Sequence, residues 1–253
     1  MKTLSRSATG TALGLILTLS VLPLNALAVS STPSTGVSST TGFCANLAAD
    51  ETKVQTTVST RLSTLDQNRS DAAQKLQEER ANFDAQVTTN RANWDADRQK
   101  NFTALEAKAT TATEQQAVSA FEQTVLADVA THRSTIDAAR DTFRAGEDQA
   151  LAGRQAQVNT AVSSFQSAIS TSESAAQSSC DSGATPSSVR LTFVMSMKNA
   201  RISYQTAVAA VPKIDSAVQS LAATRKSAVT AADTTFTAAV EKAGKTLKTA
   251  LHQ

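Results

Sequence analysis

Apolar side chains recur along most of the chain at steps of three or four positions, and the pattern closes at every eleventh position. In the first long stretch, one row consists of Val54, Leu65, Leu76 and Val87, and a second row consists of Ala72, Phe83, Trp94 and Leu105. Strands would alternate every second residue, so this spacing predicts amphipathic α-helices. Eleven residues in three turns is about 3.67 per turn, which predicts helices that are nearly straight or coil gently to the right.

The local sequence repeats together with the apolar rows. The segment LQEERANFDAQ begins at Leu76, and the similar segment VTTNRANWDAD follows it directly from Val87. The same 4, 4, 3 step continues over residues 121–169 and again over residues 214–251. This recurrence indicates an internal repeat of helical units.

Two interruptions divide the helical pattern. Residues 178–188 read SSCDSGATPSS, and the dense cluster around Gly183 and Pro186 predicts a loop. Pro212 lacks an amide proton and its ring collides with the preceding turn, so we expect a kink or a short break near Val211. The apolar repeat resumes beyond the break, so we expect the helix axis to continue.

The two cysteines, Cys44 and Cys180, suggest how the first helices are arranged. In an oxidising compartment two thiols in one small chain usually pair, and such a bond requires a hairpin near residue 112. Thr111 and Glu114 have the spacing of a capping box, which marks the start of a helix at the same place. The open alternatives are free thiols, or one unbroken helix over 45–178 whose copies are crosslinked.

The predicted fold class is therefore all-α, as an elongated antiparallel three-helix bundle or coiled coil with 11-residue (hendecad) repeats. The three helices are expected at about 44–109, 113–178 and 187–251, and residues at equal height on the first two should have numbers that add to about 224. The predicted core along the seam is Leu65, Leu76, Phe83, Val87, Trp94, Leu105, Phe121, Phe143, Phe165 and Phe236.

One polar pair is expected to set the register of the first two helices. Arg80 lies within a turn of Glu147 in this arrangement, and a buried polar pair can fix register in a coiled coil. The alternative is that Arg69, Arg80 and Arg91 edge the seam, with their aliphatic stems buried and their charged heads in water.

The N-terminal residues have the pattern of a secretory signal. Lys2 and Arg6 precede an apolar run over 12–24, and Ala26-Leu27-Ala28 resembles a cleavage site. The run is shorter than the roughly 20 residues that span a bilayer, which favours a cleaved signal over the alternative, an uncleaved anchor. We expect a signal peptide at 1–28, a flexible Ser/Thr-rich leader at 29–43, and an exported protein that is periplasmic, in the cell envelope or extracellular.

Composition and charge agree with a thin bundle. Only 4% of the residues are aromatic, so a wide core would be hard to fill, whereas narrow seams can bury alanine. Residues 45–179 carry 13 Lys/Arg and 18 Asp/Glu, and residues 185–253 carry nine and three. The basic segment is expected to pack against the acidic one, or else to face an anionic surface.

The sequence offers little for catalysis. His132 and His252 are its only histidines, and no metal-binding pair such as Cys-x-x-Cys is present. We therefore expect no metal, no cofactor, no small-molecule substrate, no nucleic acid and no enzymatic activity. The expected function is that of an exported structural or interaction protein, such as an envelope spacer, stalk or scaffold, which binds a protein partner or itself through helical faces.

Two other functions stay open. Repeats of this period also occur in helices on lipid surfaces, as in apolipoproteins, and the resemblance here is one of period only. A lipid- or membrane-surface-binding helical module is therefore one alternative. A periplasmic holdase-like bundle that binds partner proteins is the other.

Overall fold

The computed structural model describes residues 42–251, and the predicted signal peptide and nearly all of the predicted leader lie outside this range. The described chain forms four helices: α1 (Phe43–Glu106), α2 (Ala112–Asp181), α3 (Pro186–Ala210) and α4 (Asp215–Ala250). Over these residues the links between helices are short and no strand occurs, so the predicted all-α fold is confirmed. The third predicted helix is divided into α3 and α4.

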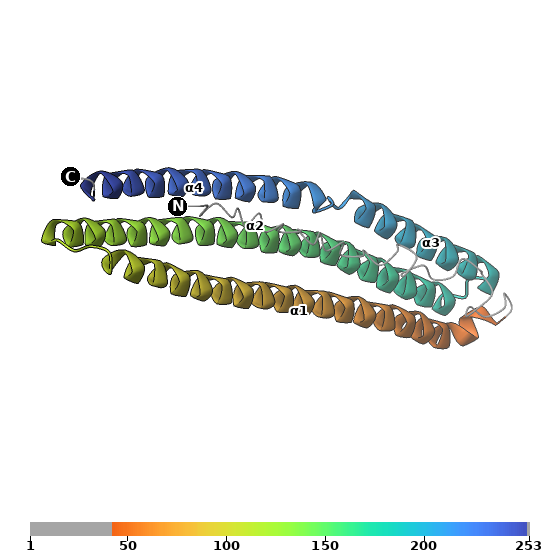
Figure 1. The fold of residues 1–253 in the computed structure, drawn as a ribbon. Coiled ribbons are helices and arrows are strands. Elements are labelled where there is room, and N and C mark those ends of the chain that lie inside the picture. Colours follow the sequence, from red (N-terminus) through yellow and green to blue (C-terminus); the bar gives the residue numbers. More distant parts are fainter. Residues whose placement is uncertain (1–41, 252–253) are drawn as a thin grey trace.

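The helices form a long, narrow rod with α2 in the middle (Figure 1). α1 lies along one side of α2, and α3 followed by α4 lies along the other; the sequence colours of α1 and α2 run in opposite directions. α2 packs against all three other helices, and α1 also reaches α3. At 1.5 Å per residue, the 70 residues of α2 give a rod of roughly 105 Å.

The turn between α1 and α2 carries the predicted capping box. The Thr111 hydroxyl accepts a hydrogen bond from the Glu114 backbone N–H at 3.2 Å, and the Glu114 carboxylate accepts from the N–H groups of Thr111 and Thr110 at 2.9 and 2.8 Å. These backbone hydrogen bonds, from Thr111 first, hold the pKa of Glu114 below its usual value. The helix break here rules out a single helix over 45–178 in this structure.

The other two links also follow from their residues. Gly183 has a φ of +80°, a conformation that glycine adopts without strain, and Pro186 stands in the first turn of α3, where its missing N–H is not needed. Pro212 lies in the break between α3 and α4. Its carbonyl accepts a hydrogen bond from Arg154 Nη1 at 2.7 Å, so α2 holds the break in place.

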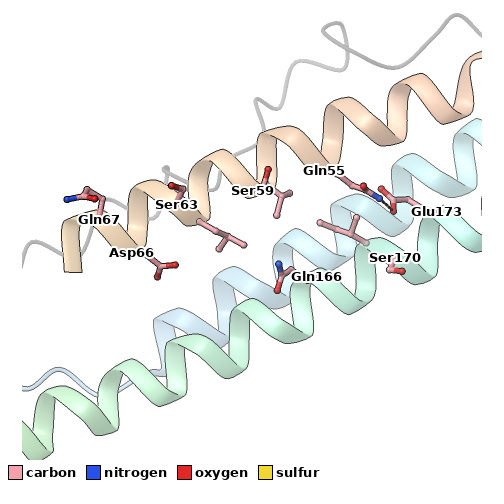
Figure 2. Close-up of a pocket in the computed structure, with 11 residues that line it drawn as sticks. Gln55, Ser59, Ser63, Asp66, Gln67, Gln166, Ser170 and Glu173 are labelled. Carbon is pink, nitrogen blue, oxygen red and sulfur yellow. Dashed lines mark hydrogen bonds between the residues drawn. The ribbon is translucent and has the colours of Figure 1, made fainter. Parts of the chain in front are cut away.

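Near the α3 end of the rod, α1 and α2 leave a groove between them (Figure 2). Gln55 of α1 donates a hydrogen bond to Glu173 of α2 at 3.0 Å at one end of this groove. The groove continues along α1 to Gln67.

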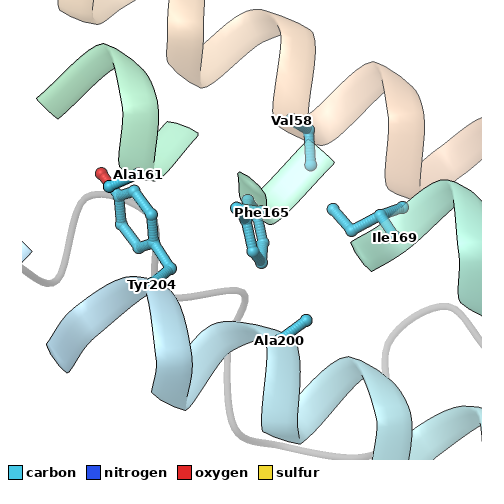
Figure 3. Close-up of a cluster of buried hydrophobic side chains, with 6 residues drawn as sticks. All are labelled: Val58, Ala161, Phe165, Ile169, Ala200 and Tyr204. Carbon is cyan, nitrogen blue, oxygen red and sulfur yellow. The ribbon is translucent and has the colours of Figure 1, made fainter. Parts of the chain in front are cut away.

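The hydrophobic core is split into separate clusters. At the α3 end, one cluster contains Phe43, Leu47, Ala176, Val189 and Phe193. The next contains Val58, Ala161, Phe165, Ile169, Ala200 and Tyr204 (Figure 3). At the other end, two clusters contain Phe102, Val125, Val129 and Ala243, and Ala109, Val118 and Leu247. Between Val58 and Phe102, α1 has no buried residue.

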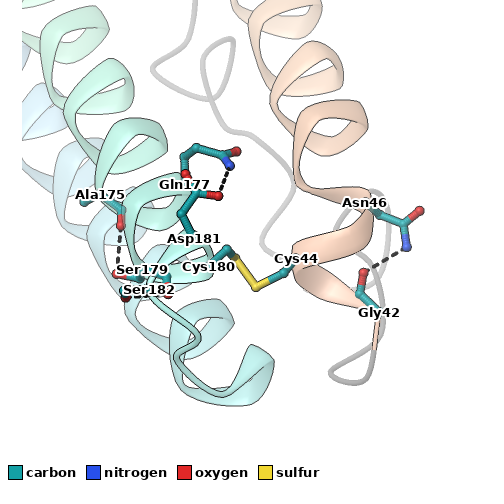
Figure 4. Close-up of a disulfide and its surroundings, with 9 residues drawn as sticks. All are labelled: Gly42, Cys44, Asn46, Ala175, Gln177, Ser179, Cys180, Asp181 and Ser182. Atoms are coloured by element: carbon teal, nitrogen blue, oxygen red, sulfur yellow. Dashed lines mark hydrogen bonds between the residues drawn. A yellow bond between two sulfur atoms is a disulfide. The ribbon is translucent and has the colours of Figure 1, made fainter.

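A disulfide between Cys44 and Cys180 joins the start of α1 to the end of α2, as predicted (Figure 4). It closes a sequence separation of 136 residues. One boundary of the prediction is wrong, because the expected leader extended to residue 43. Phe43 is instead the first residue of α1 and is fully buried, with its ring 5.8 Å from that of Phe193. The apolar side chain beside the cysteine therefore belongs to the core.

Candidate functional site

In the middle of the rod, α1 and α2 are joined by charged side chains in place of a buried apolar core. The motif Arg-x-x-x-Asp occurs twice on each helix, and the two copies are separated by one unit of the apolar repeat. On α1 they are Arg80 with Asp84 and Arg91 with Asp95; on α2 they are Arg133 with Asp137 and Arg144 with Asp148. We call these eight residues the ion-pair ladder.

Each arginine of the ladder meets an aspartate of the other helix. Arg144 binds Asp84 at 2.8 and 2.9 Å, and Arg91 binds Asp137 at 2.8 and 2.7 Å. Two similar pairs, at 2.7 to 3.1 Å, are Arg133 with Asp95 and Arg80 with Asp148. In all four pairs both terminal nitrogens of the guanidinium contact the carboxylate, which is the strongest geometry for such pairs.

The pKa values of the ladder carboxyls reflect these contacts. The hydrogen bond from Arg133, helped by Arg98, lowers the pKa of Asp95 to about 2. Arg144 lowers the pKa of Asp84, and Arg91 lowers that of Asp137, because a guanidinium favours the charged form of its partner. These three carboxyls are therefore fully ionised at neutral pH.

The ladder has a single register. The residue numbers of every pair add to 228: 80 with 148, 84 with 144, 91 with 137, and 95 with 133. The expected value of 224 holds at the disulfide and is wrong by one turn in the ladder, so Arg91 faces Asp137 and not His132. Helical side chains lean toward the N-terminus of their own helix, which raises the sum for residues in contact across two opposed helices.

The predicted pair of Arg80 and Glu147 is brought together, with Nη2 2.7 Å from Oε2. Asp148 is a second partner of the same guanidinium at 2.8 Å. The alternative, in which the arginine heads lie in water, is wrong for this row, because Arg91 binds Asp137 and Arg69 donates to Asn159 at 2.8 Å.

The prediction of a buried core position is wrong for two residues. Phe83 is 44% exposed and Trp94 is 54% exposed. The residues that follow them, Asp84 and Asp95, face α2 and bind arginines. One step along a helix turns a side chain by about 100°, so the aromatic side chains point away from α2. Phe165 is buried, and the half-buried residues of the prediction are Leu65, Leu76, Val87, Leu105, Phe121, Phe143 and Phe236.

Sequence reasoning based on apolar rows missed most of the ladder. Asp84, Asp95, Asp137, Asp148 and the two arginines of α2 had no assigned partner, although their i, i+4 spacing and their repeat with the apolar period are visible in the sequence. A search for charged residues that repeat with the apolar period would have found them.

A second polar contact joins α2 to α4. His132 Nε2 lies 2.8 Å from Asp233 Oδ1, and the imidazole ring lies 4.7 Å from the ring of Phe236. Nearby, the Arg225 guanidinium of α4 lies 4.5 Å from the ring centre of Phe143. These contacts pack polar groups on aromatic rings, which suits a helix interface.

The described residues show neither a metal-ligand cluster nor a membrane-crossing helix. Over 42–251, no three His, Cys, Asp or Glu side chains gather as ligands for a metal ion. In the same range no helix is long and apolar enough to cross a bilayer.

One face of α3 is apolar and open to solvent. Leu191 is 62% exposed, Met195 is 56% exposed and Ile202 is 48% exposed. Met195 lies one turn beyond Leu191, and Ile202 lies three turns beyond it, so all three share one side of the helix. The buried residues Val189, Phe193, Ala200 and Tyr204 occupy the opposite side. We call the three exposed residues the α3 apolar face.

Comparison of the chain with protein families, curated proteins and solved structures gave no match.

Proposed function

We propose that the protein is an exported, non-catalytic rod that acts as a spacer or scaffold in the cell envelope or outside the cell. In this proposal the rod is an elongated antiparallel three-helix bundle whose seam follows the 11-residue repeat, and its faces bind a protein partner or another copy. It has no nucleic-acid partner and no small-molecule substrate.

The observation that carries the proposal is the ion-pair ladder. A spacer must hold a fixed length, and a smooth apolar seam with a regular repeat could slip by whole repeats. The four pairs of Arg80, Arg91, Arg133 and Arg144 all obey one register, and a slip would leave end members of the ladder without a partner. The Cys44–Cys180 bond adds a covalent stop at one end.

Export is supported by two features. The N-terminal sequence predicts a signal peptide, and disulfides persist mainly in oxidising compartments outside the cytoplasm. Fractionation of producing cells, followed by intact mass measurement without reductant, tests this part. The expected product lies outside the cytoplasm, begins near Val29 and is lighter by two hydrogens; a full-length, reduced, cytoplasmic product contradicts export.

The spacer role is tested by shortening the rod in register. Deleting 81–91, 134–144 and 222–232 together removes one unit of the repeat from α1, α2 and α4, and leaves Arg80 opposite Asp148 and Asp95 opposite Arg133. The rod should shorten by roughly 16 Å and still fold. Deletion of 81–91 alone is the control, and it should fold poorly because it breaks the register.

The length of the folded rod and the recovery of cells that lack the protein together distinguish a spacer from other roles. Cells that lack the protein should recover their normal behaviour with the full chain and not with the folded, shortened rod, because a spacer depends on its length. Full recovery with the shortened rod contradicts the proposal.

A second candidate is a protein that binds an anionic membrane surface, and the α3 apolar face favours it. This face belongs to a segment, 185–253, with nine Lys/Arg and three Asp/Glu, and apolar residues beside basic ones suit anionic lipid. Sedimentation with anionic vesicles, compared with neutral ones, tests this. Binding lost in the Leu191→Ser/Met195→Ser protein, and kept in the control Leu126→Ser, would favour the membrane over the spacer.

A further inference from the structure

The groove between α1 and α2 has the features of a ligand site that the rod itself does not require. It has a volume of about 770 Å³. Its apolar lining contains Val58, Leu62 and Ile169, which are buried or half-buried. Its exposed rim contains serines such as Ser63 and Ser170 (Figure 2). An apolar lining with a few polar groups is typical of small-molecule sites.

Glu173 is the unusual residue of the groove. It is only 7% exposed, and its Oε2 accepts the hydrogen bond from Gln55, whereas its Oε1 is buried without a hydrogen-bond partner among the described residues. A buried carboxylate oxygen without a partner is costly unless a cation or donor meets it. Burial and then the nearby charge of Glu173 raise the pKa of Glu51, one turn before Gln55, so the Glu173 carboxylate acts on its surroundings as an uncompensated negative charge.

A second carboxylate lies farther along the groove. Asp66 is one repeat beyond Gln55, which corresponds to roughly 16 Å along the axis of α1. Its side chain is 74% exposed, and its ion pair with Arg69 is long, at 3.4 Å. Both charged side chains that line the groove are therefore acidic, and an apolar strip separates them.

We propose that this groove binds a linear aliphatic polyamine. The Glu173 side chain turns its unpartnered Oε1 toward the groove and accepts a hydrogen bond from one ammonium group. The methylene chain lies over Val58, Leu62 and Ile169, and a distal ammonium group reaches Asp66. The serine hydroxyls of the rim accept hydrogen bonds from the remaining N–H groups. A divalent metal ion fits the groove poorly, because the two carboxylates are too far apart to bind one ion.

Calorimetric titration of the oxidised protein at physiological ionic strength tests the proposal, with spermine, spermidine, putrescine and Mg²⁺ as probes. Spermine should bind one to one and at least tenfold more tightly than putrescine, which is too short to reach both carboxylates. Mg²⁺ should give no saturable heat. Absence of one-to-one spermine binding, or equal affinity for putrescine, overturns the proposal.

Variants separate the groove from general attraction between charges. Glu173→Gln should weaken spermine binding at least tenfold, and Asp66→Asn should weaken it several-fold. The control Asp97→Asn removes an exposed aspartate of the same helix outside the groove, and should leave affinity unchanged. Equal loss in all three proteins would indicate non-specific attraction and overturn the proposal.

Thermal melting without ligand distinguishes a binding role of Glu173 from a structural one. Glu173→Gln should raise the melting temperature, because it removes a buried charge and keeps an oxygen that accepts from Gln55. A fall in melting temperature assigns the carboxylate to the fold and overturns the proposal. Asp66→Asn changes an exposed side chain, so its loss of spermine affinity reports binding without a change in the fold.

Discussion

Arg133 of α2 binds Asp95 of α1 through both of its terminal nitrogens, at 2.9 and 2.7 Å from the two carboxylate oxygens. One repeat away on each helix, Arg144 binds Asp84 in the same way. The ion pairs thus recur every 11 residues on both helices, and they occupy the part of α1 that has no buried residue.

The coupling between Asp95 and Arg133 can be measured with a double-mutant cycle. Asp95→Ala, Arg133→Ala and the double variant should give a coupling free energy of about 1 kcal/mol, at the upper end for partly exposed pairs because the contact is bidentate. Urea unfolding measures it. The exposed pair of Asp97 and Lys100 is the control and should couple far more weakly; equal values would contradict a special role for the ladder.

Acid should weaken the rod through the same residue. The pKa of Asp95 is about 2 in the folded protein and near 3.8 without its partners, so its ionised form stabilises the fold above about pH 4. That stabilisation is lost as the pH falls from about 4 to 2. Glu51, whose raised pKa favours protonation, acts in the opposite direction, so comparison with a variant is needed.

The comparison uses thermal melts of the wild type and of Asp95→Asn between pH 2 and 6. The difference in stability between the two proteins should be largest above pH 4 and shrink toward pH 2. A constant difference across this range would show that the carboxylate of Asp95 does not contribute through its charge.

Reduction of the disulfide should destabilise the protein without unfolding it. A crosslink between residues 136 apart lowers the conformational entropy of the unfolded chain. The resulting stabilisation of the fold is on the order of 4 to 5 kcal/mol, as an upper value. The reduced protein should keep its helical circular dichroism at room temperature, with a lower urea midpoint. Cys44→Ser/Cys180→Ser should match the reduced protein and be insensitive to reductant, and a reductant effect on that variant would point to another cause.

Two helical glycines of α2 should respond differently to alanine. A Cβ at Gly153 meets nothing within 4 Å, so Gly153→Ala should stabilise the protein by about 1 kcal/mol. A Cβ at Gly146 would lie 2.6 Å from Leu221 Cδ2 of α4, so Gly146→Ala should gain less or lose stability. Equal gains in thermal melts would contradict the close packing of α2 on α4.

The sequence was sufficient for the features that depend on local chemistry. The turn at Thr111 was visible in its capping box, and the break at Pro212 in the missing amide proton. The pairing of Cys44 with Cys180 followed from the tendency of two thiols in one small exported chain to form a disulfide. Each of these depends on a few neighbouring residues or on a strong chemical preference.

The positions of Phe83 and Trp94 could not be found by the same reasoning. Apolar periodicity assigns the bulkiest residues to the seam, but here arginine stems and aspartates fill the space that faces α2. The groove at Glu173 could not be predicted from the sequence either, because it depends on the distance between α1 and α2 at one position along the rod.

Small-angle X-ray scattering of the oxidised protein tests most directly whether α1 folds back along α2. A monomer with a maximum dimension of about 105 to 115 Å is expected, because the longest helix has 70 residues. A particle about twice as long, or one that grows with concentration into crosslinked dimers, would mean that α1 and α2 form one continuous helix, and would contradict the ladder and the hairpin together.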